Sequence, residues 1–165
     1  MEVIIRPAKT EDLPSILEIV NHAILHTTAI YDYDARTLEE QKAWFVEKQA
    51  WEFPVIVAES ANEVIGFGTY GPFRLKIGYR FTIEHSVYVN DKATGKGIGR
   101  LILQELIDLA KDQNYHSMIG VIDASNSVSI EFHKKFGFIE TGVLKQAGYK
   151  FDKWLDVSMM QLLLK

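Results

Sequence analysis

The residues best suited to chemistry gather in two stretches of the sequence. Glu84 precedes the segment "HSVYV", which leads into the loop "NDKATGKGIGR" with its alternating Gly95, Gly97 and Gly99. A second stretch, "NSVSIEFHKKFGF", carries His133. A carboxylate and an imidazole are side chains that move protons in catalysis. A glycine-rich loop that opens a helix can bring the main chain close to a bound anion.

Two known phosphate-binding patterns do not fit this loop. A P-loop needs Ser or Thr after its Gly-Lys pair, but Gly97 follows Lys96 here. A dinucleotide fingerprint would need a glycine where Arg100 stands, and it would open a βαβ unit. A helix N-terminus still offers unpaired N–H groups and a charge of roughly +0.5, which suit a pyrophosphate. The alternative, that the glycines only shape a tight turn, stays open on the loop alone.

Composition limits the remaining classes of function. The chain has 165 residues, 47% of them hydrophobic, so we expect a single domain over residues 1–165. The net charge of −4 and the dispersed basic residues argue against nucleic acid as a partner. There is no cysteine, and the histidines show no ligand-like spacing, so no metal site is expected. Neither a secretory signal nor an apolar run of roughly 20 residues is visible, so we expect a cytoplasmic protein without a membrane partner.

Short apolar segments in alternation predict a mixed α/β fold. We expect strands at residues 2–6, 54–60, 63–71, 81–89, 117–123, 138–144 and 155–164. Helices are expected after Thr10 and after Thr37, which forms a capping-box pattern with Glu40. A third helix from Gly97 to Gln113 should bury Ile98, Leu101, Ile102, Leu106 and Leu109, and a short fourth helix should lie within 126–136. This order indicates a mostly antiparallel sheet flanked by helices.

The two stretches together resemble the GNAT superfamily of acyl-CoA N-acetyltransferases. In that family a pattern of Gln or Arg, two residues, Gly, one residue, and Gly or Ala binds the pyrophosphate of acetyl-CoA. Gly97 and Gly99 occupy the glycine positions, whereas Thr94 stands where Gln or Arg is usual. The resemblance implies the GNAT fold, in which a splayed strand pair binds the cofactor, with acetyl-CoA as co-substrate and no metal.

The resemblance also implies roles for individual residues. Asn126 would contact the pantetheine arm, and His133 lies where many members have a tyrosine that can protonate the leaving thiolate; His85 is the alternative in that proton path. Glu84 is the candidate general base, acting through a water, because an ammonium group must lose a proton before it can attack a thioester. The full set expected to bind acetyl-CoA is Val87, Tyr88, Val89, Gly95, Lys96, Gly97, Ile98, Gly99, Arg100 and Asn126.

A closer likeness is visible within the superfamily. The segments "HTTAIYDY", "YGPFR", "YRFTIEHSVYV" and "GYKFDKWLDVSMMQL" look like the phosphinothricin and methionine sulfoximine acetyltransferases, which acetylate the α-amino group of unusual amino acids. This implies a homodimer and a substrate site formed by Arg74, Leu75, Lys76, Arg80, Glu84, His85 and Ser86. Tyr31 and Tyr33 could line the substrate pocket, or they could belong to the core or the dimer interface.

Two other functions stay open. The first is a non-catalytic acyl-CoA-binding sensor that keeps the fold and has lost the chemistry. The second is an acetyltransferase for a protein or peptide amine. Glu84, Asn126 and His133 favour an enzyme over a sensor, since a sensor would be free to lose them. A peptide substrate gives no clear reason for the arginines at positions 74 and 80.

Overall fold

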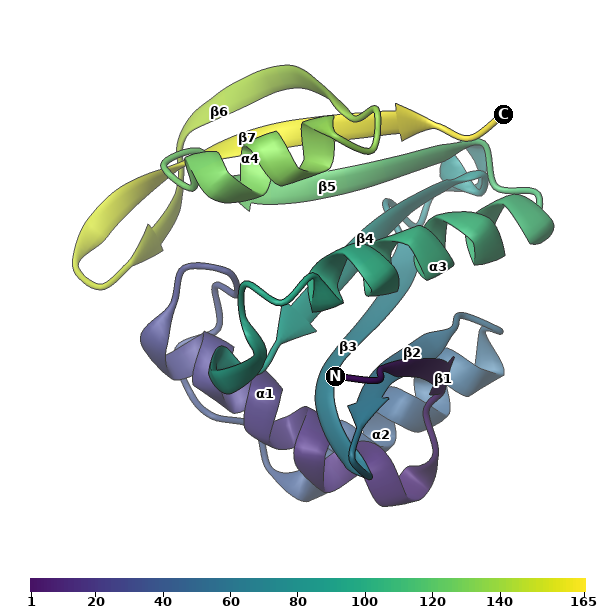
Figure 1. Cartoon of the computed structure of the whole chain (residues 1–165). Coiled ribbons are helices and arrows are strands. Elements are labelled where there is room, and N and C mark those ends of the chain that lie inside the picture. The colour runs from purple at the N-terminus through teal and green to yellow at the C-terminus, as the bar shows by residue number, and fades with distance from the viewer.

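The computed structural model describes residues 1–165 and places one seven-stranded sheet between helices (Figure 1). The strands lie in the order β1-β2-β3-β4-β5-β7-β6, and only the β4–β5 pair is parallel. The elements are β1 (Ile4–Pro7), α1 (Leu13–His26), α2 (Leu38–Ala50), β2 (Val55–Ser60), β3 (Glu63–Pro72), β4 (Thr82–Val89), α3 (Ile98–Asp112), β5 (Ser117–Asp123), α4 (Ser127–Lys134), β6 (Ile139–Lys150) and β7 (Lys153–Leu163). The expected mostly antiparallel α/β sheet is therefore confirmed.

Helices cover both faces of the sheet because side chains alternate along the strands. On β2, Val55 and Val57 join the core formed with α1 and α2, whereas Ile56 and Ala58 join the core formed with α3. Figure 1 shows α1 and α2 on one side of the strands and α3 crossing the other side. None of the helices is long and apolar enough to cross a membrane.

The β4–β5 pair holds together at one end only. The pairs are Thr82 with Ser117, Ile83 with Met118, and Glu84 with Ile119, and no further pair forms. Antiparallel pairing of β4 with β3 continues to Val89. The two strands therefore part after Glu84, as expected for a splayed strand pair.

The first two helices begin for different reasons. Thr37 accepts from the Glu40 N–H at 3.2 Å and its own N–H donates to the Glu40 carboxylate at 2.7 Å, so the predicted capping box is confirmed. The predicted N-cap at Thr10 is wrong. Residues 10–12 form a 3-10 turn, and α1 begins only at Leu13, with a proline in its first turn.

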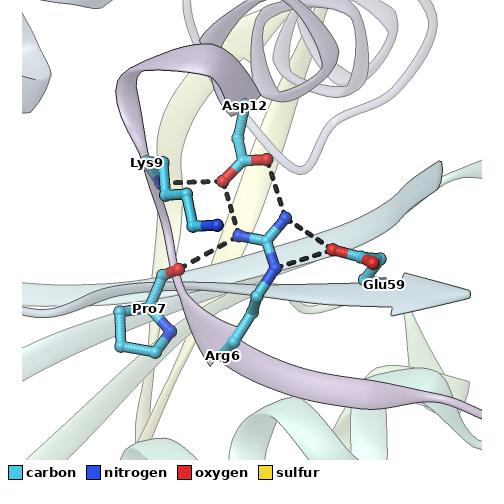
Figure 2. A network of polar contacts seen from close by, with 5 residues as sticks. All are labelled: Arg6, Pro7, Lys9, Asp12 and Glu59. Atoms are coloured by element: carbon cyan, nitrogen blue, oxygen red, sulfur yellow. Dashed lines mark hydrogen bonds and ion pairs between the residues drawn. The ribbon is translucent and has the colours of Figure 1, made fainter. Parts of the chain in front are cut away.

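A polar network explains why α1 starts late. Figure 2 shows the Arg6 guanidinium between Asp12 and Glu59, with Nη1 at 2.7 Å from Asp12 Oδ2 and Nε at 2.7 Å from Glu59 Oε2. Asp12 also accepts the Lys9 N–H at 2.7 Å. Since Arg6 holds the pKa of the Asp12 carboxyl below its usual range, the carboxylate stays charged and joins β1, the 3-10 turn and β2.

Two other details differ from the prediction. On α3 the expected Leu101 is 44% exposed, whereas Leu103, Ile107 and Ala110 are buried beside Ile98, Ile102 and Leu106. The buried stripe is rotated by about one residue, since i and i+4 positions share a face and Leu101 falls to the solvent side. The strands β6 and β7 are longer than expected and meet at Phe151 and Asp152, which have φ of 52° and 57°.

The contact between α3 and the sheet predicts a cost for any side chain at Gly68. A methyl group there would lie 2.4 Å from Ile102 Cγ2 and 3.0 Å from Leu106 Cδ1, and both of these side chains are fully buried. We expect Gly68→Ala to lower the free energy of unfolding by about 1–3 kcal/mol in urea denaturation. Gly142→Ala is the matched control, because nothing lies within 4 Å of that position. Equal stability of the two variants would contradict this packing account.

Candidate active site

One large cleft runs through the gap between β4 and β5. Its volume is about 1510 Å³, and residues from both faces of the sheet line it. Thr28, Ala29 and Tyr31 come from the α1–α2 connection on one face. The α3 N-terminus and α4 contribute from the other face. The parting of the strands therefore gives two ligands access to one point from opposite sides.

Main-chain N–H groups of β4 face this gap. Asn90 donates to the Ile65 carbonyl at 2.9 Å, so the even-numbered residues of β4 are those that bond to β3 in the alternating antiparallel ladder. The N–H groups of Val87 and Val89 consequently point toward β5, with which pairing has ended. Tyr88 also lines the cleft, but its main-chain N–H faces β3 and its ring packs against the α1–α2 core.

Glu84 lies at the point where the strands separate. Its side chain is half-buried and lines the cleft with Ser86, which follows on the same face of β4. Burial raises the pKa of the Glu84 carboxyl, while the positive charges of Arg74 and Lys48 act in the opposite direction. A carboxyl with a raised pKa is a stronger proton acceptor once ionised. The geometry thus suits Glu84 for general base catalysis.

His85 and His133 form a buried pair on the other face of β4. Their Nε2 atoms lie 3.1 Å apart, and the rings stack with centroids 5.0 Å apart. His133 Nδ1 lies 2.7 Å from the Ser129 carbonyl, which can only accept, so this nitrogen carries a proton. In a neutral His133, Nε2 is then the acceptor, and the proton between the rings belongs to His85. The tautomers follow from these contacts.

The His pair changes the interpretation of His133. Burial and the neighbouring His133 lower the pKa of His85 to about 3, and burial lowers the pKa of His133 while the Ser129 carbonyl raises it. Both rings are therefore neutral at pH 7. Both nitrogens of His133 are engaged, so it has no free N–H to offer a sulfur atom in this arrangement. Proton donation by His133 would require one of the two contacts to open.

The glycine loop forms the tight turn that the sequence indicated. Gly95 and Gly97 have φ of 78° and 80°, which glycine adopts without the strain of a Cβ, so they do shape a tight turn. Gly97 is also the N-cap of α3 and has no side chain to cap it. The N–H groups of the first turn, at Gly99 and Arg100, are then free at the cleft. The tight turn is therefore present, and the binding of an anion by these N–H groups stays a prediction.

Three other residues expected to bind the cofactor have fewer atoms free to contact it than predicted. Ile98 is buried in the core at 1% exposure, so only its main chain can reach a ligand. The Lys96 ammonium donates to the Lys92 carbonyl within the loop at 3.0 Å, and Lys96 does not line the cleft. Asn126 lines it, but its Oδ1 caps α4 by accepting the Ser129 N–H at 3.1 Å. The Asn126 amide N–H groups remain available.

The expected substrate residues separate into two groups. Glu84, His85 and Ser86 line the cleft, whereas residues 74–76 and 80 lie in the exposed segment between β3 and β4 and do not line it. Leu75 is 82% exposed. Arg74 lies over the Phe73 ring and lowers the pKa of Glu84, so its charge acts near the cleft mouth. The structure gives Leu75, Lys76 and Arg80 no contact with the site.

Sequence reasoning missed how the α1–α2 connection is held. Thr28 Oγ1 donates to Asp123 at the end of β5 at 2.5 Å, and the Tyr31 ring lies against Gly148, where any Cβ would clash with it. Lys150 is buried, and its ammonium donates to the carbonyls of Ile24, Thr27 and Ile30 at 2.6, 2.7 and 2.5 Å. The hydrogen-bonded partners lie 95 to 126 residues apart in sequence, so no local pattern indicates them.

Two solved structures that this chain resembles are acetyltransferases bound to acetyl-CoA. A putative acetyltransferase from Salmonella typhimurium, solved with its cofactor acetyl-CoA, has a TM-score of 0.96 and 40% identity over 99% of this chain and 94% of that chain. A phosphinothricin acetyltransferase from Sinorhizobium meliloti in complex with acetyl-CoA has a TM-score of 0.96 and 34% identity over 99% and 89% of the two chains. The fold and the forked cleft together define an acetyltransferase.

The sequence comparison gives the family. Residues 5–159 match the family described as "Acetyltransferase (GNAT) domain". The L-methionine sulfoximine/L-methionine sulfone acetyltransferase of Pseudomonas aeruginosa is 43% identical over 163 residues, which cover 98% of this chain and 95% of that protein. The chain belongs to the GNAT acetyltransferase family, as its two motifs indicated.

The buried His pair predicts acid sensitivity. Below about pH 6.5 the unfolded chain protonates its histidines, whereas the folded His85 stays neutral, so stability decreases as the pH falls toward 3. Between pH 7 and pH 5 the wild type should lose about 2 kcal/mol more unfolding free energy than His85→Gln, which keeps an N–H donor toward His133. Urea denaturation at both pH values measures this difference.

The control for this measurement is His116→Gln, since His116 is exposed. It should keep the pH dependence of the wild type. An identical pH dependence for wild type and His85→Gln would show that His85 is already protonated in the folded state, against the present assignment.

Proposed function

We propose that the protein transfers the acetyl group of acetyl-CoA to the α-amino group of a small amino acid or analogue of the methionine sulfoximine, methionine sulfone or phosphinothricin type. One observation carries the proposal: β4 brings the Glu84 carboxylate and the unpaired N–H groups of Val87 and Val89 into one cleft. Its volume of about 1510 Å³ exceeds the roughly 300–1,000 Å³ of a single-ligand pocket. Relatives named for these substrates support the substrate class.

The cleft fits acetyl-CoA at three places. The free N–H groups at the N-terminus of α3, next to Gly97, suit a pyrophosphate, and both Gly97 and Gly99 line the cleft. The Asn126 amide lies at the start of α4, where it can contact the pantetheine arm. Val87 and Val89 provide donors for the thioester carbonyl oxygen. Since α3 and α4 lie on one face of the sheet, the co-substrate enters from that face.

The amine enters from the opposite face, beside Glu84. The Glu84 carboxylate takes a proton from the substrate ammonium, directly or through a water, and the free amine nitrogen forms the bond to the acetyl carbon. The N–H groups of Val87 and Val89 stabilise the negative charge that develops on the carbonyl oxygen. As the carbon–sulfur bond breaks, the electron pair leaves with the sulfur, and the attacking nitrogen gives its remaining extra proton to the thiolate or to water, which leaves a neutral amide. Holding both reactants in one cleft makes this a direct transfer.

The thiolate needs no proton from His133 in this proposal. His133 and His85 instead form a neutral, stacked wall of the cleft, fixed by the Ser129 carbonyl and packed against Phe138. Of the two cations that lower the pKa of Glu84, Arg74 has the larger effect and is exposed, so we assign to it the substrate carboxylate, which arginine can bind with two hydrogen bonds.

The experiment that tests the function is a thiol-release assay with acetyl-CoA and a panel of amines. We expect turnover with methionine sulfoximine, methionine sulfone or phosphinothricin, and none with a peptide N-terminus or lysine. Tight acetyl-CoA binding without turnover on any amine would instead support a sensor. Turnover on peptides alone would support the second alternative.

Glu84→Gln tests the base. The amide keeps the size of the side chain and cannot accept the proton, so kcat should fall by about 10²–10⁴-fold while acetyl-CoA affinity, measured by calorimetry, stays that of the wild type. Ser86→Ala, on the same face of β4, is the matched control and should retain kcat far better. An unchanged kcat in Glu84→Gln would remove Glu84 from the mechanism.

We also propose that the active form is a homodimer with β6 and β7 at the interface. β6 is an edge strand, and the β6–β7 hairpin exposes Leu144, Phe151 and Trp154 at 54%, 52% and 63%. A long exposed edge strand with apolar side chains is a surface on which a second copy can pack.

Sedimentation should therefore give twice the chain mass of 18.8 kDa. Trp154→Glu should yield monomers, whereas Trp51→Glu, which changes a tryptophan of 57% exposure at the end of α2, should remain a dimer. A monomeric wild type would contradict the proposed assembly.

A further inference from the structure

One half-buried cation on the Glu84 side of the sheet has no carboxylate in contact. The ammonium of Lys48, on α2, donates to the Tyr70 carbonyl at 2.8 Å and forms no ion pair. It lies 5.8 Å from the centroid of the Trp44 ring and 5.5 Å from that of Phe53. One carbonyl satisfies only one of three ammonium donors, so burial here costs free energy unless the charge serves another group.

The missing side chain of Gly71 creates the space for this cation. A Cβ at Gly71 would lie 2.9 Å from Lys48 Nζ. Gly71 is also the direct cross-strand partner of Glu84. Side chains opposite each other in an antiparallel pair lie on the same face, with Cβ atoms about 4.5–5.5 Å apart. Lys48 therefore occupies the position beside Glu84 that a side chain at Gly71 would otherwise fill.

The charges around these two groups are few. Glu84 faces Arg74 from the β3–β4 segment and Lys48 from α2, and Tyr88 lies four residues further along its own strand. Lys48 faces Glu47 on its own helix and Glu84 on β4. Burial lowers the pKa of Lys48 to about 8, and both carboxylates oppose this, so the ammonium is mostly charged at pH 7.

Arg74 and Lys48 differ in how firmly they are held. Arg74 has the larger effect on the pKa of Glu84 in this arrangement, but it is exposed, so water and salt screen it and it can turn toward a substrate. Lys48 is fixed by the Tyr70 carbonyl between two aromatic rings, where screening is weaker. If Arg74 binds the substrate carboxylate, Lys48 is the cation that stays with Glu84.

We propose that Lys48, held above Gly71 by the Tyr70 carbonyl, is a positioning residue that keeps the Glu84 carboxylate ionised and ready to accept the proton of the substrate ammonium. The inference rests on the proposed role of Glu84 as the base. Lys48 acts through Glu84 and does not itself touch the reacting atoms.

Lys48→Met removes the charge and keeps the apolar stem. Because a nearby cation favours the ionised carboxylate, its loss raises the pKa of Glu84, and the base stays protonated up to a higher pH. The acid limb of the kcat/KM profile should shift to higher pH by about 1 unit, so at a given pH on that limb kcat/KM falls roughly tenfold. At pH values above this limb, kcat/KM should approach that of the wild type. Lys48→Arg should restore the wild-type pH profile.

Two further variants make the test specific. Gly71→Ala should displace the ammonium and move the limb in the same direction while Lys48 is still present. Lys42→Met removes an exposed lysine of the same helix, paired with Glu39 at 3.2 Å, and should leave the profile unchanged. Carbon-13 NMR titration of the Glu84 carboxyl, assigned by its absence in Glu84→Gln, reads the same shift without turnover.

The possible outcomes separate the two proposals. An unshifted Glu84 titration in both Lys48→Met and Gly71→Ala overturns the inference about Lys48, and a low kcat in Glu84→Gln would then still support the base. A shifted titration with an unshifted acid limb overturns it as well, since Glu84 would not be the group that limits activity. Full activity of Glu84→Gln overturns the proposed base itself.

Discussion

The separation of β4 from β5 after Glu84 and Ile119 is the constraint on which the rest of the site depends. While two strands stay paired, their main-chain donors are used in the ladder and no ligand can reach them. Past the last pair, the donors of Val87 and Val89 face open space, and the sheet has a passage between its two faces. The same separation places the Glu84 carboxylate at the edge of that passage.

Two imidazole rings fill the space at the point where the strands separate. His85 is the first residue of β4 beyond the last pair, and Gly120 is the corresponding residue of β5. A Cβ on Gly120 would lie 3.1 Å from His85 Nε2 and 3.6 Å from His133 Nε2, so the stacked rings use the space that glycine leaves. Neutral rings suit this place, because two buried imidazolium ions would repel each other. Thr28 ties the α1–α2 connection back to Asp123 across the opening.

Local patterns predicted much of this architecture. The capping box of Thr37 and Glu40 needs only four residues, and the turn at Gly97 needs only a glycine, so both could be read directly from the sequence. The N-cap at Thr10 failed because Asp12 is held by Arg6, which also binds Glu59 of another strand. Periodicity placed the apolar face of α3 but not its rotation, which packing against the sheet decides.

The candidate site was predicted less completely than the fold. Motif positions located Glu84, the glycine loop and Asn126, and the comparisons establish the family in which such motifs occur. They could not show that both nitrogens of His133 are engaged, nor that Lys48 reaches the place beside Glu84, since each contact depends on residues far apart in sequence. Long-range packing therefore decides the protonation states, although local sequence decides where the groups lie along the chain.

The central claim is that the free donors of β4 receive the thioester carbonyl beside Glu84. A crystal structure of the acetyl-CoA complex measures this most directly. The account predicts the carbonyl oxygen at about 2.7–3.2 Å from the main-chain nitrogen of Val87 or Val89, on the path between the cofactor face and Glu84. A thioester bound elsewhere in the cleft, with neither nitrogen in reach of its carbonyl oxygen, would contradict it.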